Sequence, residues 1–298
     1  MITKEATAVA PAPERAAPQP PRPARKQRAW DEVPRWQIYL PLGIYLVFTL
    51  IPFYWILLFS LRPAGSTSLV PWPMTFDHFE KVWTERSFGT YFQNSVLVGV
   101  ATLIMTTLVA LAGGYALARF NFKVKRIFML ALLCSQFVPG ALLLVPLFEI
   151  FANLRMINSL GSVILAETVF QLPLSMILIS NFIKNVPYSL EEAAWVDGCG
   201  RMRAFRIVVL PLLRPGLIAV GSFAFVHSWN HFLFALMFLN NPEKQTIPVG
   251  LNTLMGADSV DLGALAAGGI VAAVPVVIVF AFIQKWLITG FSAGAVKG

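Results

Sequence analysis

Residues 189–215 read SLEEAAWVDGCGRMRAFRIVVLPLLRP and form the longest polar interruption between two hydrophobic spans in the second half of the chain. The stretch follows a proline, and Ser189 precedes Glu192 by three residues. That spacing is typical of a capping box, in which a serine hydroxyl caps a helix and a glutamate reaches back to the backbone. It predicts a short helix over residues 190–197.

The glycines and prolines in this stretch predict where the chain turns. Gly198 and Gly200 end the short helix and permit a sharp turn. A second helical piece should follow, because Pro211 and Pro215 break or bend the chain only later, just before the next span. One face of the first helix is expected to be shallow and approachable, and it would carry Leu190, Ala193, Ala194 and Asp197.

The composition places this stretch in a membrane protein. Of 298 residues, 57% are hydrophobic and only 13% are charged, whereas a soluble domain carries roughly a quarter charged residues. The hydrophobic residues gather in blocks of about 20 or more, the length of a membrane-spanning helix. We predict an all-α fold with six transmembrane helices, at about residues 36–61, 94–118, 127–151, 157–183, 216–239 and 262–288.

Basic residues predict the orientation. The net charge is +8, and most of the 23 lysines and arginines fall in the N-terminal tail, in two loops and at the C-terminal end. Cytoplasmic loops carry such an excess, so both termini and the loop 184–215 should be cytoplasmic, and no nucleic-acid partner is needed to explain the charge. Residues 1–35, rich in proline, alanine and arginine, are expected to be a disordered tail. Cys134 and Cys199 lack spaced partners, so no disulfide is expected.

Polar residues inside the predicted spans suggest a pathway through the membrane. Such groups are costly in hydrocarbon and should face protein or a wet cavity. His227, Asn230 and His231 share one helical face and could bind hydroxyl groups, and the alternative is that this face packs against another subunit. The remaining pathway candidates are Gln136, Glu167 and Trp229.

The sequence also allows other functions to be weighed: an ion-coupled carrier, a metal site, a membrane enzyme and a lipid-binding loop. Glu167 lies near the middle of a span and could serve an ion- or proton-coupled carrier. His227 and His231 have the spacing of two metal ligands, but no third ligand is evident in the sequence, so no metal site is expected. A membrane enzyme has little support because no catalytic motif appears. The loop 184–215 could rest on lipid headgroups, yet its small and acidic residues favour docking of a protein.

The chain resembles a known family over residues 36–298. The loop resembles the EAA loop of membrane subunits of binding-protein-dependent ABC importers. Similarity to the carbohydrate-uptake branch, of the type of the second maltose permease subunit, extends over further motifs: Asn94-Ser95, Gly114-Tyr115-Ala116-Leu117-Ala118-Arg119-Phe120, Leu144-Val145-Pro146-Leu147-Phe148, Trp229-Asn230 and Thr246-Ile247-Pro248-Val249-Gly250-Leu251.

This resemblance implies a type I ABC importer permease in the cytoplasmic membrane. Its partners would be a second permease subunit, two copies of an ABC ATPase that bind ATP and Mg²⁺, an extracytoplasmic sugar-binding protein, a carbohydrate and membrane lipid. The chain itself would need no cofactor and would not be an enzyme. Family members often have an acid where this chain has His231. The resemblance implies contacts to the ATPase from the coupling residues Glu192, Ala193, Ala194, Asp197 and Gly198, and from the C-terminal residues Gly294, Ala295, Val296, Lys297 and Gly298.

Overall fold

The computed structural model describes residues 34–84, 87–256 and 260–295. The chain divides into two compact units, residues 1–51 and 52–298. The described part of the first unit is the start of α1 (Arg35–Leu61). Its side chains are exposed almost throughout, and α1 is apolar and long enough to cross a membrane. The expected disordered tail falls mainly on residues 1–33, which lie outside the described residues.

The second unit is built from helices, and the described residues contain no strand. Its longest helices are α3, α6 and α13, and three shorter pieces are 3-10 helices (η2, η4) or a π-helix (η3). In chain order the helices are α2 (Asp77–Thr84), α3 (Phe88–Arg119), α4 (Lys125–Ser135), η2 (Gly140–Leu143), α5 (Leu144–Asn153), α6 (Leu160–Lys184), α7 (Ser189–Val196), α8 (Arg201–Ala204), η3 (Phe205–Val209), α9 (Leu210–Leu212), α10 (Arg214–Asn230), α11 (Leu233–Phe238), η4 (Pro242–Lys244), α12 (Ile247–Thr253) and α13 (Leu262–Ala295).

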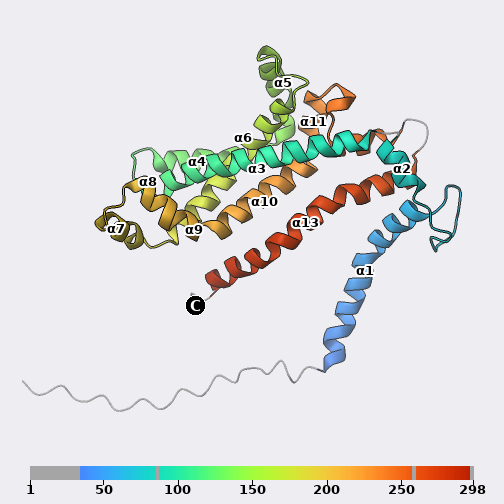
Figure 1. Cartoon of the computed structure of the whole chain (residues 1–298), viewed down its shortest axis with the longest axis horizontal. Helices are drawn as coiled ribbons and strands as arrows, with labels where there is room; N and C mark the ends of the chain where they lie inside the picture. Colours follow the sequence, from blue (N-terminus) through green and yellow to red (C-terminus); the bar gives the residue numbers. More distant parts are fainter. Residues whose placement is uncertain (1–33, 85–86, 257–259, 296–298) are drawn as a thin grey trace, which may run out of the picture. The chain divides into compact units, whose positions relative to one another are not determined.

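Helix α3 packs against α6 and α10, and α13 packs along α10 (Figure 1). Small residues explain the close approach of α3 and α6, because small side chains let helix backbones meet. Ala110 is completely buried, and a Cβ atom added to Gly114 would lie 2.7 Å from the side chain of Ile179. Ala110 and Gly114 therefore lie in a tight contact between α3 and α6.

Two of the six predicted spans are interrupted. Residues 127–151 do not form one continuous helix as expected: α4 ends at Ser135, and the following helical segment, which starts at Gly140, is bent from it by 95°. Pro139 separates the two pieces with an extended backbone, as a residue without an N–H donor favours. The expected helix over 216–239 is also too long, because α10 ends at Asn230 and His231 adopts an extended backbone. Four helices are long and apolar enough to cross a membrane, or up to six if each bent pair forms one span.

The two ends of the second unit carry different structures. Helices α7 and α8 lie at one end of α3, and α2 lies at the other, beside the start of α13 (Figure 1). At the α2 end, Lys81 forms an ion pair with Asp261, with 2.7 Å between the Lys81 Nζ and Asp261 Oδ2 atoms. The predicted coupling residues on α7 therefore lie at the opposite end of the second unit from this ion pair (Figure 1).

Candidate functional site

Helix α7 forms the first half of the polar loop, but it does not start as predicted. The expected capping box of Ser189 and Glu192 is wrong, because helical backbone geometry already begins at Tyr188 and the helix start has no side-chain cap. The backbone N–H groups of Glu191 and Glu192 both donate to the Tyr188 carbonyl. Pro187 presets a helical φ angle just before this turn, so Ser189 lies inside the helix rather than at its cap. The Glu192 side chain therefore has no capping role.

The predicted coupling residues form an exposed surface on α7. Glu192, Ala193, Asp197 and Gly198 are exposed, and Ala194 is half-buried. The apolar Val196 beside them is 87% exposed. The exposed part of α7 therefore combines acidic, small and apolar side chains. This set of residues is called the α7 surface below.

A glycine-dependent turn follows α7. Gly198 has a φ angle of 83°, in the left-handed region that glycine adopts without a Cβ penalty. The N–H groups of Gly198 and Cys199 donate back to the carbonyls of Trp195 and Ala194, which closes the helix end. The predicted turn at Gly198 is confirmed, whereas Gly200 has an ordinary φ angle of −66°. The second helical piece runs through α8, η3 and α9, and then bends by 73° into α10.

The acid that holds α7 in place was not among the residues predicted from the sequence. Glu191, next to the predicted Glu192, points inward and has a side chain that is 1% exposed. Its Oε1 atom accepts a hydrogen bond from Arg119 Nε at 2.6 Å, and its Oε2 atom accepts one from Tyr115 O–H at 2.8 Å. Arg119 Nη2 also donates to the Val186 carbonyl at 2.9 Å. We call Tyr115, Arg119 and Glu191 the α3–α7 lock.

Glu167 forms a second buried cluster, this time with the predicted histidines. Its side chain is 1% exposed, and His227 Nδ1 lies 3.2 Å from its Oε2 atom. His231 Nδ1 lies 2.8 Å from Oε1 without the alignment of a hydrogen bond. The two imidazole rings stack with centroids 5.4 Å apart, and the Phe234 ring lies 4.5 Å from that of His231. Nothing in the sequence indicated that Glu167, 60 residues away from His227, would face both rings.

The structure separates the other pathway candidates. Trp229 is buried among α3, α10 and α13, where its Nε1 atom donates to the Ala272 carbonyl at 3.0 Å. The Asn230 amide donates to Val226 within its own helix. Gln136 lies in the break after α4, and its Nε2 atom is 3.5 Å from the Phe170 carbonyl on α6. Only Glu167, His227 and His231 are therefore brought together.

No group of three or more His, Cys, Asp or Glu side chains in the described ranges is arranged to hold a metal ion. In the Glu167 cluster, the carboxylate faces the Nδ1 atom of both histidines. A carboxylate in this position orients an imidazole and determines which of its nitrogen atoms carries a proton. The carboxylate therefore orients the His227 imidazole by a hydrogen bond, and the His231 imidazole lies beside it.

Comparison with known proteins identifies the family. The model of the family described as "Binding-protein-dependent transport system inner membrane component" matches residues 110–292. The chain belongs to this family. The permease is 34% identical to the diacetylchitobiose uptake system permease protein DasC of Streptomyces coelicolor, over 91% of this chain and 98% of the relative. It is also 34% identical to the sulfoquinovosyl glycerol transport system permease protein SmoH of Agrobacterium fabrum, over 87% of this chain and 93% of the relative.

A solved structure has the same fold. A chain in the crystal structure of a bacterial ABC transporter involved in the import of the acidic polysaccharide alginate superposes with a TM-score of 0.72 and 20% sequence identity. The match covers 85% of this chain and 98% of that chain. The protein is therefore a multi-pass membrane permease of the sugar ABC transporter type, and its family is one of transport proteins rather than catalysts.

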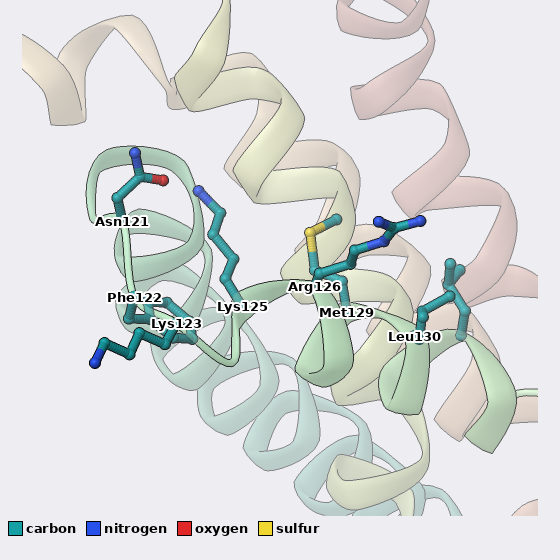
Figure 2. A pocket seen from close by; sticks show the side chains of 8 residues that line it. Asn121, Phe122, Lys123, Lys125, Arg126, Met129 and Leu130 are labelled. Atoms are coloured by element: carbon teal, nitrogen blue, oxygen red, sulfur yellow. The ribbon is translucent and has the colours of Figure 1, made fainter.

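A basic hollow lies on the permease where α3 leads into α4. It has a volume of about 540 Å³. Figure 2 shows Lys123 and Arg126 pointing in different directions from the loop, with Met129 beside Arg126. Lys125 Nζ donates to the Phe120 carbonyl at 3.2 Å. The hollow is wide and its basic side chains point apart, so they do not form a binding site for one ligand. Its charge is typical of a cytoplasmic loop.

The C-terminal contact residues are only partly described. Helix α13 extends through Gly294 and Ala295. Val296, Lys297 and Gly298 lie outside the described residues, and their contact with an ATPase stays a prediction.

Proposed function

We propose that this chain is one of two permease subunits of an ATP-driven importer for a sugar or related carbohydrate. In this proposal six spans cross the cytoplasmic membrane, with both termini and the α7 surface on the cytoplasmic side. The basic residues of the α3–α4 and α6–α10 connections support that orientation. The named relatives, one for diacetylchitobiose and one for sulfoquinovosyl glycerol, support a carbohydrate as the substrate.

The observation that carries the proposal is the α7 surface. It presents Glu192, Asp197 and the exposed Val196 on a short helix, which the buried Glu191 anchors to α3. Two copies of an ABC ATPase would bind ATP and Mg²⁺, and one of them would dock here. The second permease subunit would contribute the equivalent surface for the other copy.

ATP-driven transport then follows from coupling between distant sites. Closure of the ATPase pair on ATP would move both docked helices. The membrane helices would then turn from inward- to outward-facing. The ATPase-docking surface and the substrate pathway are coupled in this way because each has different contacts in the two states. An extracytoplasmic sugar-binding protein would deliver the substrate to the outward-facing state. The description of the family as binding-protein-dependent supports such a partner.

The oriented histidines are the proposed substrate contacts in this chain. His227 and His231 have side chains that are 39% and 23% exposed, so a sugar hydroxyl could reach them. Imidazole nitrogens both donate and accept hydrogen bonds, and the nearby Phe234 ring adds an apolar surface. The same face could instead pack against the second permease, and substitution of His231 distinguishes the two through transport and subunit assembly.

The proposal is tested by replacing Glu192 with alanine in the full transporter. We expect the ATPase to be lost from the purified complex and uptake to fall, because the docking contact loses its charged group. The matched control is Glu243→Ala, which removes an exposed acid from η4, near the opposite end of α3. If Glu192→Ala retains both the ATPase and normal uptake, the docking role is wrong.

A second candidate function rests on the Glu167 cluster. A buried carboxylate next to two imidazoles is a common feature of proton pathways in carriers. Uptake that continues after ATP depletion, but stops when the proton gradient is removed, would favour an ion-coupled carrier over the proposed importer.

A further inference from the structure

We propose that the α3–α7 lock is a positioning device that makes α3 a rigid strut between the α7 surface and the opposite end of the bundle. Tyr115 and Arg119 would not touch the ATPase or the substrate. They would hold the docking helix at a set angle to α3, so that a movement of α7 must move α3. This inference rests on the proposed function, because it explains how a docked motor would act on the membrane helices.

The contacts at the α7 end join four segments. Arg119 is the last residue of α3, and it binds both Glu191 in α7 and the Val186 carbonyl before α7. Its guanidinium lies 5.3 Å from the centre of the Tyr188 ring. Tyr115 binds Glu191 and also packs against Phe205 of η3, with ring centroids 4.9 Å apart. The helix before the turn and the helix after it are thus both held to α3.

The carboxylate geometry favours a stiff joint. Each Glu191 oxygen accepts a hydrogen bond from a different side chain of α3, so the carboxylate cannot rotate without losing one of them. Hydrogen bonds to an ionised group are shorter and stronger than neutral ones. The Glu191 side chain is 1% exposed. Water therefore cannot compete with Arg119 and Tyr115 for hydrogen bonds to its carboxylate.

The other end of α3 is held as well. Asn94 Nδ2 donates to the carbonyls of Glu243 and Gln245, both at 2.9 Å. Ser95 Oγ accepts the backbone N–H of Ile247 at 2.8 Å. These contacts attach α3 to the η4–α12 segment, which the proposed orientation places on the side of the sugar-binding protein. Both ends of one helix are therefore clamped to segments that would face different partners.

Helix α3 is suited to transmit motion over this distance. Its 32 residues span about 48 Å at 1.5 Å per residue. Helices α6 and α13 contain interior prolines, Pro173 and Pro275, which weaken a helix at one point. The α3 sequence contains no proline. Of these three long helices, α3 is the one without an interior proline.

The test removes the charge of Glu191 in the full transporter, reconstituted in lipid vesicles with its ATPase, second permease and binding protein. Glu191→Gln keeps the shape of the side chain but removes its charge from the lock. We expect the ATPase to stay bound and to hydrolyse ATP, while the number of sugars imported per ATP falls about fivefold or more, the lower range of typical coupling between sites. Arg126→Gln, an arginine outside the lock on α4, is the control and should leave this ratio unchanged.

A paired variant protects the test against misfolding. Arg119→Met combined with Glu191→Leu replaces the buried ion pair with apolar side chains, which a protein often tolerates without loss of stability. It should assemble with the ATPase and show the same fall in sugars per ATP, because packing without directed hydrogen bonds leaves α7 free to turn on α3. A merely structural role would lower thermal stability but leave the ratio of sugars to ATP unchanged.

The outcomes separate this inference from the proposed function. If uptake by the unmodified transporter does not require ATP, the proposed function is wrong. If uptake requires ATP, but Glu191→Gln and the paired variant import as many sugars per ATP as the unmodified protein, the strut is wrong and the function stands. Loss of the ATPase from Glu191→Gln, as expected for Glu192→Ala, would also overturn the strut, because Glu191 would then act in docking.

Discussion

Two buried carboxylates in the described part of the permease have opposite surroundings. At the α7 end, Glu191 is bound by Arg119, whose side chain is 9% exposed, and by the Tyr115 hydroxyl. In the middle of the bundle, Glu167 faces His227 and His231, which are considerably more exposed. The first carboxylate is sealed behind a cation that never loses its charge. The second faces two imidazoles whose side chains are 39% and 23% exposed.

This difference separates two tasks. A sealed ion pair has no open hydrogen-bonding position for a ligand, so the α3–α7 lock can only hold helices together. The Glu167 cluster keeps accessible imidazole atoms, so it can respond to a polar molecule. Burial of an acid alone therefore does not mark a substrate site in this protein, and the exposure of its partners is what distinguishes the two clusters.

The largest expected effect comes from removing the cation of the sealed pair. Arg119→Ala leaves Glu191 buried without its counter-ion, and breaking a buried pair in this way typically costs about 3–5 kcal/mol. We expect a large fall in the thermal stability of the purified permease. Arg126→Ala is the matched control, because Arg126 makes no ion pair among the described residues. A loss below about 1 kcal/mol, the range of surface ion pairs, would show that the pair is not sealed.

The sequence was sufficient to predict the class of fold and the exposed side of α7. The hydrophobic blocks predicted an all-helical membrane protein, and Glu192, Asp197 and Gly198 lie on the exposed side of the loop as a docking surface requires. The prediction at Gly198 succeeded because only one local property matters there, a positive φ angle that glycine adopts without penalty. Local chemistry of this kind can be read from a few neighbouring residues.

The sequence could not predict contacts between distant segments. Glu191 and Glu192 are adjacent acids, and only the packing of α7 on α3 decides which one is buried. Arg119 fitted the pattern of a topology signal, so its role in the lock was not visible. The break at Pro139 was also missed, because a proline inside a hydrophobic block is compatible with a kinked span as well as with two helices.

A smaller effect is expected at the Gly198 turn, which follows α7. Gly198→Val forces a side chain onto a backbone with a φ angle of 83°, which costs roughly 1–2 kcal/mol. Nothing lies within 4 Å of a Cβ atom at this position, so the cost is one of backbone conformation alone. We expect fewer sugars imported per ATP, measured in vesicles. Gly198→Asn is the control, since asparagine tolerates the left-handed region, and equal losses in both variants would contradict the backbone explanation.

The open cluster should contribute less to stability than the sealed one. Glu167→Gln keeps the size of the side chain and one hydrogen-bonding oxygen, and interhelical hydrogen bonds in membranes average about 0.6 kcal/mol. We expect thermal stability to change little while the apparent affinity for the transported sugar falls, because the His227 imidazole loses the carboxylate that orients it. A stability loss as large as that of Arg119→Ala would place Glu167 with Glu191 as a structural acid.

The smallest effect is expected at a third carboxylate, Asp261. It is partly exposed and serves as a comparison for the buried Glu191 and Glu167. The hydrogen bond from Lys81, together with the backbone N–H of Ala264, holds the pKa of Asp261 below its usual value of 3.8. Because the folded pKa is lowered, this stabilisation is present above about pH 4 and is lost as the pH falls through the folded pKa. The side chains of Lys81 and Asp261 are 39% and 32% exposed, so solvent screens the pair and Asp261→Asn should cost at most a few tenths of a kcal/mol.

Thermal unfolding at neutral pH in low and high salt measures this cost, which should shrink further with salt. The loss in Arg119→Ala should stay nearly constant, since salt screens a buried pair much less, and equal salt dependence at the two sites would show that Glu191 is as open to solvent as Asp261.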